Sequence, residues 1–208
     1  MSAVSAYPRY DKLKSELPRK GIHLLAGVVP LAYAVWGNRT VVMAVLAMML
    51  AQMIATEVLR CRPNPLGRLF NAWFGSMLRS HESDRLLGAT HYCIAALLCV
   101  GLMPQAAAVM ALLFLAVGDT AASLVGMTWG RVQIGNKTLE GALAFWLSAS
   151  LVAVSAHWGW PGQFPLIPAL LAAPVAALAE LLLQRHDDNW TVPLAAGGVI
   201  WALMAATG

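Results

Sequence analysis

The chain of 208 residues is 59% hydrophobic and only 12% charged, with a formal net charge of +4. An average soluble domain is about 25% charged, so this composition excludes a water-soluble domain, which would lack the polar residues to cover its surface. We expect an all-α integral membrane protein. The length suits one domain, and no linker rich in Ser, Gly or Pro divides it. Residues 1–208 are therefore expected to form a single polytopic membrane domain, with residues 1–20 as a cytoplasmic segment.

Seven apolar stretches approach the length of a transmembrane helix, which is about 20 residues with a range near 17–25. In chain order they are residues 22–37, 40–58, 86–103, 105–126, 139–157, 166–184 and 190–206. The first is short and the last two are separated only by a brief polar loop, so six or eight spans stay open beside the seven we expect. Between the second and third spans, the segment RCRPNPLGRLFNAWFGSMLRSHESDR has a basic and an aromatic side. This pattern predicts an amphipathic helix that lies in the membrane interface.

The charged residues orient the chain. Thirteen of the fourteen basic residues fall on one side of this arrangement, and only Arg39 falls on the other. Lys and Arg accumulate in cytoplasmic loops, so we expect the amino terminus in the cytoplasm and, with seven spans, the carboxyl terminus outside. All ten acidic residues fall at the same loops or helix ends. A site built from them would face the cytoplasm, whereas an ion pathway would distribute charges through the membrane.

Asp119 is the most unusual acidic residue, because it lies inside an apolar helix within GDTAASLVGMTWG. It precedes the end of that helix by about eight residues, which at 1.5 Å per residue places it roughly 12 Å inside the span. Ionisable groups at such depth are rare and functional by default, so we expect Asp119 to be catalytic or a metal ligand. The structural alternative is a hydrogen bond to Ser123, one turn on, or to an arginine of another helix.

Small residues recur every four positions on the same helix, at Gly118, Ala122, Gly126 and Gly130. Such a stripe usually indicates close helix packing. It would also allow a ligand to approach the backbone beside Asp119. Both interpretations stay open, and in the second Gly126 and Gly130 would contact a nucleotide.

The segment GRVQIGNKT that follows resembles the phosphate-binding pattern G-x-x-x-x-G-K-S/T, except that Asn136 is inserted before Lys137. That pattern should follow a strand, and we expect no strand here, which excludes an NTPase domain of that type. Lys137 and Thr138 still precede a helix whose amino end favours anions, so we expect them to bind phosphate. Glu140, in the first turn of that helix, would suit a Mg²⁺ ion that bridges phosphates.

Two further polar patches lie at the ends of the first two spans. The sequence RKGIH places Arg19 and Lys20 at the membrane surface, with His23 on the same helix face as Lys20, which favours phosphate binding. The sequence TEVLR contains Glu57 and Arg60, which support the site or simply form a salt bridge between residues i and i+3.

Two more patches lie later in the chain. In AELLLQRHDDN, Glu180 lies inside the sixth span, and Asp187, Asp188 and Asn189 occupy the turn that follows. Two adjacent carboxylates near a buried third are costly without a cation, so we expect the three acids to bind metal and Asn189 to bind nucleotide. His91 in GATHY is either a supporting site residue or a hydrogen-bonded buried histidine.

Together these residues predict nucleotide-dependent chemistry on a lipid head group. They supply cationic groups for phosphate and several carboxylates for Mg²⁺, or for Mn²⁺ in its place. Phosphoryl transfer needs little beyond positioning and charge neutralisation. The expected partners are a lipid alcohol, a nucleotide and the membrane, with no nucleic acid.

The same motifs resemble those of a known family. In order, RKGIH, TEVLR, GDTAASLVGMTWG, KTLEG and AELLLQRHDDNWTVP are similar to the motifs of the membrane polyprenol kinases, which include dolichol, phytol and farnesol kinases and the CTP-dependent diacylglycerol kinase of yeast. The resemblance covers about residues 19–197. It implies a helical membrane enzyme, in the inner membrane of a bacterium, that uses CTP or another NTP with Mg²⁺ to phosphorylate a lipid alcohol on the cytosolic side. It implies site roles for Asp119, Lys137, Glu140, Asp187 and Asp188.

Two other functions stay open. A lipid cytidylyltransferase would use CTP to make a CDP-lipid and release pyrophosphate, but the S-x-x-K-R and D-R-x-D type signatures of those enzymes are not visible here. A small transporter or structural membrane protein would show no nucleotide turnover.

Overall fold

The computed structural model describes residues 7–60 and 86–207, together with residues 65, 68 and 72 of the segment between them. The protein is 84% helical, which confirms the prediction of an all-α fold. The predicted interfacial helix falls almost wholly outside the described residues.

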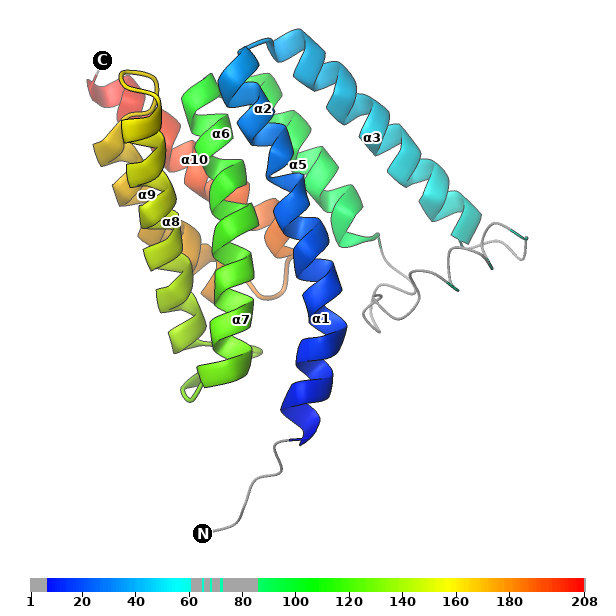
Figure 1. Ribbon diagram of the computed structural model, residues 1–208. Helices are drawn as coiled ribbons and strands as arrows, with labels where there is room; N and C mark the ends of the chain where they lie inside the picture. Colours follow the sequence, from blue (N-terminus) through cyan, green and yellow to red (C-terminus); the bar gives the residue numbers. More distant parts are fainter. Residues whose placement is uncertain (1–6, 61–64, 66–67, 69–71, 73–85, 208) are drawn as a thin grey trace.

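A helix lies over each of the seven predicted spans (Figure 1). The first span is divided at Gly27 between α1 (Tyr7–Ala26) and α2 (Val28–Trp36), so α1 also includes much of the polar amino-terminal segment. The remaining helices are α3 (Arg39–Arg60), α5 (Gly88–Leu102), α6 (Gln105–Leu113), α7 (Asp119–Trp129), α8 (Leu139–Gly159), α9 (Leu166–Leu182) and α10 (Asp188–Thr207).

Within the described part of the chain, four helices are long and apolar enough to cross a membrane. They are Arg39–Arg60, Gln105–Trp129, Leu139–Gly159 and Asp188–Thr207. The helices α5 and α9 are apolar but shorter. The count of seven crossings, and their orientation, therefore stay predictions.

The turn between α2 and α3 shows how local sequence sets the helix ends. Gly37 ends α2 with a φ of 65°, and its N–H donates to the Tyr33 carbonyl. Glycine favours this left-handed position because it has no Cβ. The next residue, Asn38, starts α3 because its side-chain oxygen accepts a hydrogen bond from the Val41 N–H at 3.1 Å.

The long helix formed by residues Gln105–Trp129 is the centre of the molecule, with α1, α8, α9 and α10 packed around it (Figure 1). In an apolar window of 18 residues on this helix, 72% of the residues are buried, whereas the share is 17–33% in the other three candidate spans. Its alanine-rich first half, α6, allows α10 and α2 to pack close to it. Asp119 and Thr120, two polar residues near the middle of this central helix, are therefore held in the interior.

A π-helical turn, η2 (Phe114–Gly118), interrupts the central helix immediately before Asp119. Such turns are frequent at functional sites, because they change the direction in which the following side chains point. The Gly118 position at its end allows α8 to approach, since a Cβ added there would lie 2.6 Å from the Phe145 ring. The turn thus sets both the rotation of α7 and its distance from α8.

A short antiparallel hairpin, β1 (Gln133–Ile134) and β2 (Lys137–Thr138), connects α7 to α8. The expectation of no strand in this segment was therefore wrong. The hairpin turn contains Gly135 with a φ of 61°, which is the glycine that a tight two-residue turn requires at its first position. The strands lie within the GRVQIGNKT segment, not before it, so they do not restore an NTPase domain.

Candidate active site

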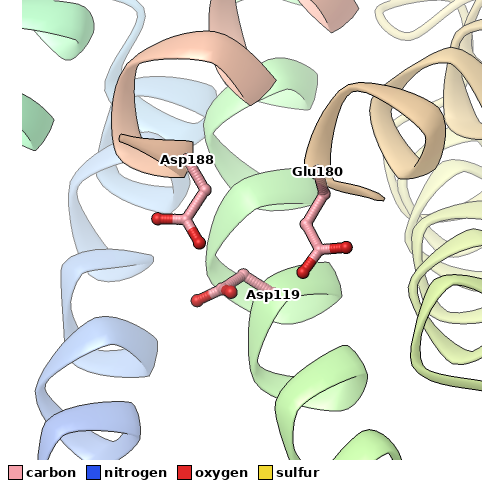
Figure 2. Close-up of side chains that lie close together, drawn as sticks. All are labelled: Asp119, Glu180 and Asp188. Carbon is pink, nitrogen blue, oxygen red and sulfur yellow. The ribbon is translucent and has the colours of Figure 1, made fainter. Parts of the chain in front are cut away.

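Three acidic side chains from three helices converge at one point. Asp119 of α7, Glu180 of α9 and Asp188 at the start of α10 each offer an oxygen atom, and these atoms lie within 4.8 Å of one another. Figure 2 shows the three carboxyl groups pointing toward a common space between their helices. Asp119 and Glu180 are each only 3% exposed. We call these three residues the acidic cluster.

Two lysines from distant parts of the chain neutralise most of the acidic cluster. The Lys20 ammonium group bonds Asp119 Oδ2, and both side chains are buried. The Lys137 ammonium group bonds Glu180 Oε1 and, at 3.1 Å, Asp188 Oδ2. Two ammonium groups against three carboxylates leave one negative charge when His23 is neutral.

The acidic cluster also keeps Lys137 charged. Burial by itself would lower the pKa of this lysine, but the carboxylates of Asp188, Glu180 and Asp119 outweigh burial and raise the pKa above its ordinary value. Lys137 is therefore a permanent cation at neutral pH beside the acidic cluster.

Among the residues that the structure describes, Asp119 bonds neither Ser123 nor an arginine, the two partners of its structural interpretation. Its partner is Lys20, and His23 Nε2 lies 3.5 Å from the same oxygen, Oδ2. Its other oxygen, Oδ1, is buried and has no hydrogen-bond partner among the described residues. Because an unpaired buried carboxylate oxygen is unfavourable, this atom is suited to accept a cation or a donor from a ligand.

The acidic cluster suits a divalent cation. Mg²⁺ prefers carboxylate oxygens as ligands, and it is usually bound through one or two carboxylates together with substrate phosphates. Three oxygen donors within reach of one ion, one of them on a carboxylate with an unpaired oxygen, fit that requirement.

The other two acids predicted as metal ligands lie apart from the acidic cluster. Asp187 turns toward its own loop, where Oδ1 accepts hydrogen bonds from the Asn189 backbone and side-chain nitrogens at 3.0 and 2.8 Å. Its Oδ2 lies 3.5 Å from His91 Nδ1. Glu140 faces the hairpin, with both carboxylate oxygens 3.2 Å from the Val132 N–H.

Three residues predicted to bind nucleotide or phosphate, Gly126, Gly130 and Thr138, pack against one another. Thr138 begins α8 because its hydroxyl accepts a hydrogen bond from the Gly141 N–H at 3.1 Å. A Cβ at Gly126 would lie 2.8 Å from the Thr138 hydroxyl, and one at Gly130 would lie 2.6 Å from the Thr138 methyl group. These contacts support the helix-packing interpretation of the stripe.

Glu57 and Arg60 form the salt bridge considered above, with Arg60 Nε 2.6 Å from Glu57 Oε2. The other carboxylate oxygen of Glu57 accepts hydrogen bonds from the Leu87 N–H at 2.6 Å and the Thr90 hydroxyl at 3.0 Å. Glu57 thus ties the end of α3 to the start of α5, and both Glu57 and Arg60 also line a cavity beside the acidic cluster.

A cavity of about 1610 Å³ borders the acidic cluster. Lys137, Glu180 and Asp188 line it, together with Ser123 and His91. Arg19 is half-buried on α1, beside the buried Lys20. Glu180 and Asp188 of the acidic cluster, with Lys137, therefore adjoin a space large enough for a substrate, while Asp119 lies behind them.

Sequence reasoning missed Gln184, which holds the hairpin against the end of α9. Its side-chain oxygen accepts a hydrogen bond from the Asn136 N–H at 2.7 Å, and its side-chain nitrogen donates to the Ile134 carbonyl at 2.6 Å. A single polar residue at a helix end has no distinctive sequence pattern, so only the structure identifies it.

One known protein is similar to this chain over nearly its whole length. The chain is 26% identical over 223 residues to CTP-dependent diacylglycerol kinase 1 of Schizosaccharomyces pombe. The alignment covers 98% of this chain and 100% of that protein. The chain is also 26% identical over 205 residues to CTP-dependent diacylglycerol kinase 1 of Eremothecium gossypii, covering 87% of this chain and 65% of that protein.

A third relative, an uncharacterized protein of Methanocaldococcus jannaschii, is 31% identical over 126 residues, or 59% of this chain and 62% of that protein. No protein-family model matches the chain. No solved structure matches it either. These similarities support the lipid kinase part of the resemblance, through relatives that are named diacylglycerol kinases.

Proposed function

We propose that this protein is a CTP-dependent lipid kinase, which transfers the terminal phosphoryl group of CTP to the hydroxyl group of a lipid alcohol in the membrane. Similarity over 98% of the chain to a protein named as such a kinase supports this proposal. The observation that carries it is the acidic cluster with Lys20 and Lys137, held in the interior of an apolar helical bundle beside a large cavity.

The residues of the acidic cluster suit phosphoryl transfer because that reaction depends mainly on positioning and charge neutralisation. Asp119, Glu180 and Asp188 would hold Mg²⁺, which neutralises phosphate charge when it is bound. Lys137 would then contact the phosphates as a fixed cation. Lys20 would hold the Asp119 side chain in place through their ion pair.

Asp119 either holds the metal ion or accepts the proton of the acceptor hydroxyl. In the transfer, the alcohol oxygen forms a bond to the terminal phosphorus of CTP while the bond from that phosphorus to the bridging oxygen breaks. The products are a lipid phosphate and CDP, and the hydroxyl proton leaves to a carboxylate. The unpaired Oδ1 of Asp119 is suited to either role.

The acceptor is a lipid alcohol of the isoprenoid or diacylglycerol class. The motifs favour an isoprenoid alcohol, whereas the relatives are named diacylglycerol kinases. The basic residues favour a site on the cytoplasmic side of a bacterial inner membrane.

The test is a substrate panel with the purified protein. Phytol, farnesol, undecaprenol, dolichol and diacylglycerol are each incubated with radiolabelled CTP, ATP, GTP and UTP. Formation of a lipid phosphate and CDP supports the kinase. Release of pyrophosphate with a CDP-lipid would identify a cytidylyltransferase, and no turnover across the panel would contradict both enzymes.

A further inference from the structure

The hairpin that carries Lys137 is joined to the end of α9 by the side chain of Gln184. The side-chain nitrogen donates to the Leu181 carbonyl at 2.6 Å as well as to Ile134, while the side-chain oxygen accepts from Asn136. One amide group therefore bonds the hairpin backbone on both sides of Gly135 and anchors itself to α9.

Gly135 is the residue that makes this attachment possible. A Cβ at this position would lie 2.3 Å from the Gln184 side-chain oxygen, which is closer than non-bonded atoms approach. Its φ of 61° is also a conformation that other residues rarely adopt. The turn is thus built around the Gln184 amide.

The attachment bears directly on Lys137 through strand pairing. Ile134, whose carbonyl accepts from Gln184, is the pairing partner of Lys137 across the hairpin. Glu180, which bonds the Lys137 ammonium group, lies four residues before Gln184. The Gln184 hydrogen bonds therefore fix the backbone of the hairpin opposite Lys137, next to two members of the acidic cluster.

We propose that Gln184 is a positioning residue for phosphoryl transfer, which acts by holding Lys137 where it contacts the phosphates of CTP. This inference rests on the proposed function. Gln184 makes no contact with the acidic cluster itself in the hydrogen bonds described above. Gln184 does line the cavity, but its side-chain amide is already bonded to Ile134, Asn136 and Leu181, so we place its effect on turnover in Lys137. A direct contact with the substrate would instead give a loss independent of Lys137.

The test is a double-mutant cycle on kcat/KM for CTP, with the acceptor that gives the highest wild-type rate. Gln184→Ala should lower kcat/KM by about tenfold, the upper range expected for one lost hydrogen-bonding group. The loss should fall on the same constant, KM or kcat, that Lys137→Ala changes. The variant with both substitutions should match Lys137→Ala within about twofold, because residues that act through each other are not additive. Losses that multiply would overturn the proposal.

Gln163→Ala is the matched control. Gln163 also donates from its side-chain nitrogen to a backbone carbonyl, that of Ala34 at 3.1 Å, but it follows the far end of α8 from Lys137. Its substitution should leave kcat/KM for CTP unchanged. Gly135→Ala should also break the contact between the hairpin and Gln184, because the added Cβ would clash with the Gln184 amide. It should lower kcat/KM for CTP as Gln184→Ala does, and again not additively with Lys137→Ala.

Hydrogen exchange supplies a measurement that does not depend on activity. In Gln184→Ala, the amides of residues 134–138 should exchange at least about tenfold faster than in the wild type, whereas those of α8 should not change. Unchanged exchange in the hairpin would overturn the positioning role. Absence of CTP turnover in the wild type, with fast exchange in the variant, would instead contradict the proposed function.

Discussion

At the scale of single residues, the buried charge of Asp119 is balanced by groups that are remote in the chain. Lys20 lies 99 residues away and bonds Asp119 Oδ2, while Oδ1 has no hydrogen-bond partner in the described part of the chain. A carboxylate held this way is oriented on one side and available on the other. This asymmetry is what a metal ligand or a proton acceptor needs.

Asp119→Asn should lower kcat by at least about a hundredfold, because it keeps the shape of the side chain but removes its charge. Steady-state assays on protein that passes a size-exclusion test for folding would measure this. A folded variant with more than about a tenth of the wild-type kcat would show that the residue only contributes to packing.

Lys137→Ala should act on a different constant. If the lysine holds the phosphates of bound CTP, the variant should have a higher KM for CTP and a nearly unchanged kcat. If the lysine contacts the phosphates only in the transition state, its loss should lower kcat. Initial rates over a range of CTP concentrations separate the two. Wild-type values of both constants in the variant would remove Lys137 from the site.

At the scale of elements, the acidic cluster forms because α7, α9 and α10 are each rotated about their axes so that one carboxylate points to the same place. Asp187 and Asp188 are neighbours in the chain, yet Asp188 faces Glu180 and Asp119 while Asp187 faces Asn189 and His91. At the start of a helix each residue is rotated by about 100° from the last, so adjacent carboxylates point to different places.

Removal of metal tests whether these helices share one ion. Because Asp119, Glu180 and Asp188 offer hard oxygen ligands, EDTA should abolish CTP turnover, and Mn²⁺ should restore part of it. Lipid phosphate formation measured before and after chelation gives the answer. Full activity after complete chelation would contradict a metal role for the acidic cluster.

The connection between α3 and α5 should behave as a structural element. Glu57→Ala removes the acceptor that Arg60 Nε, the Leu87 N–H and the Thr90 hydroxyl share, and the loss of these part-buried hydrogen bonds costs about 2 kcal/mol. We expect the Tm in detergent to fall by about 5 °C or more, with little change in the KM for CTP. An unchanged Tm together with a large rise in KM would place Glu57 in the substrate site instead.

At the scale of the whole molecule, the central helix of residues Gln105–Trp129 organises the bundle (Figure 1). The other candidate spans are much less buried, and exposed large apolar side chains lie on them. A bilayer can cover that surface, so the protein combines an apolar exterior with a charged interior site.

Topology can be tested directly. With seven spans and the basic residues on one side, a tag at the amino terminus should report the cytoplasm and a tag at the carboxyl terminus the opposite compartment. Protease protection of tagged protein in oriented vesicles measures both. Tags in the same compartment would show an even number of spans and leave the acidic cluster unchanged.

The sequence alone determined the helices and the kinds of residue available for chemistry. Hydrophobic runs and helix-ending residues such as Gly37 and Asn38 act locally, so the positions of the helices could be predicted. The tertiary structure decided which acids converge and which cations pair with them, because both depend on how helices rotate and pack against one another. The pairing of Lys20 with Asp119, the separation of Glu140 from the acidic cluster, and the attachment of the hairpin by Gln184 all join distant parts of the chain. No local pattern records such contacts.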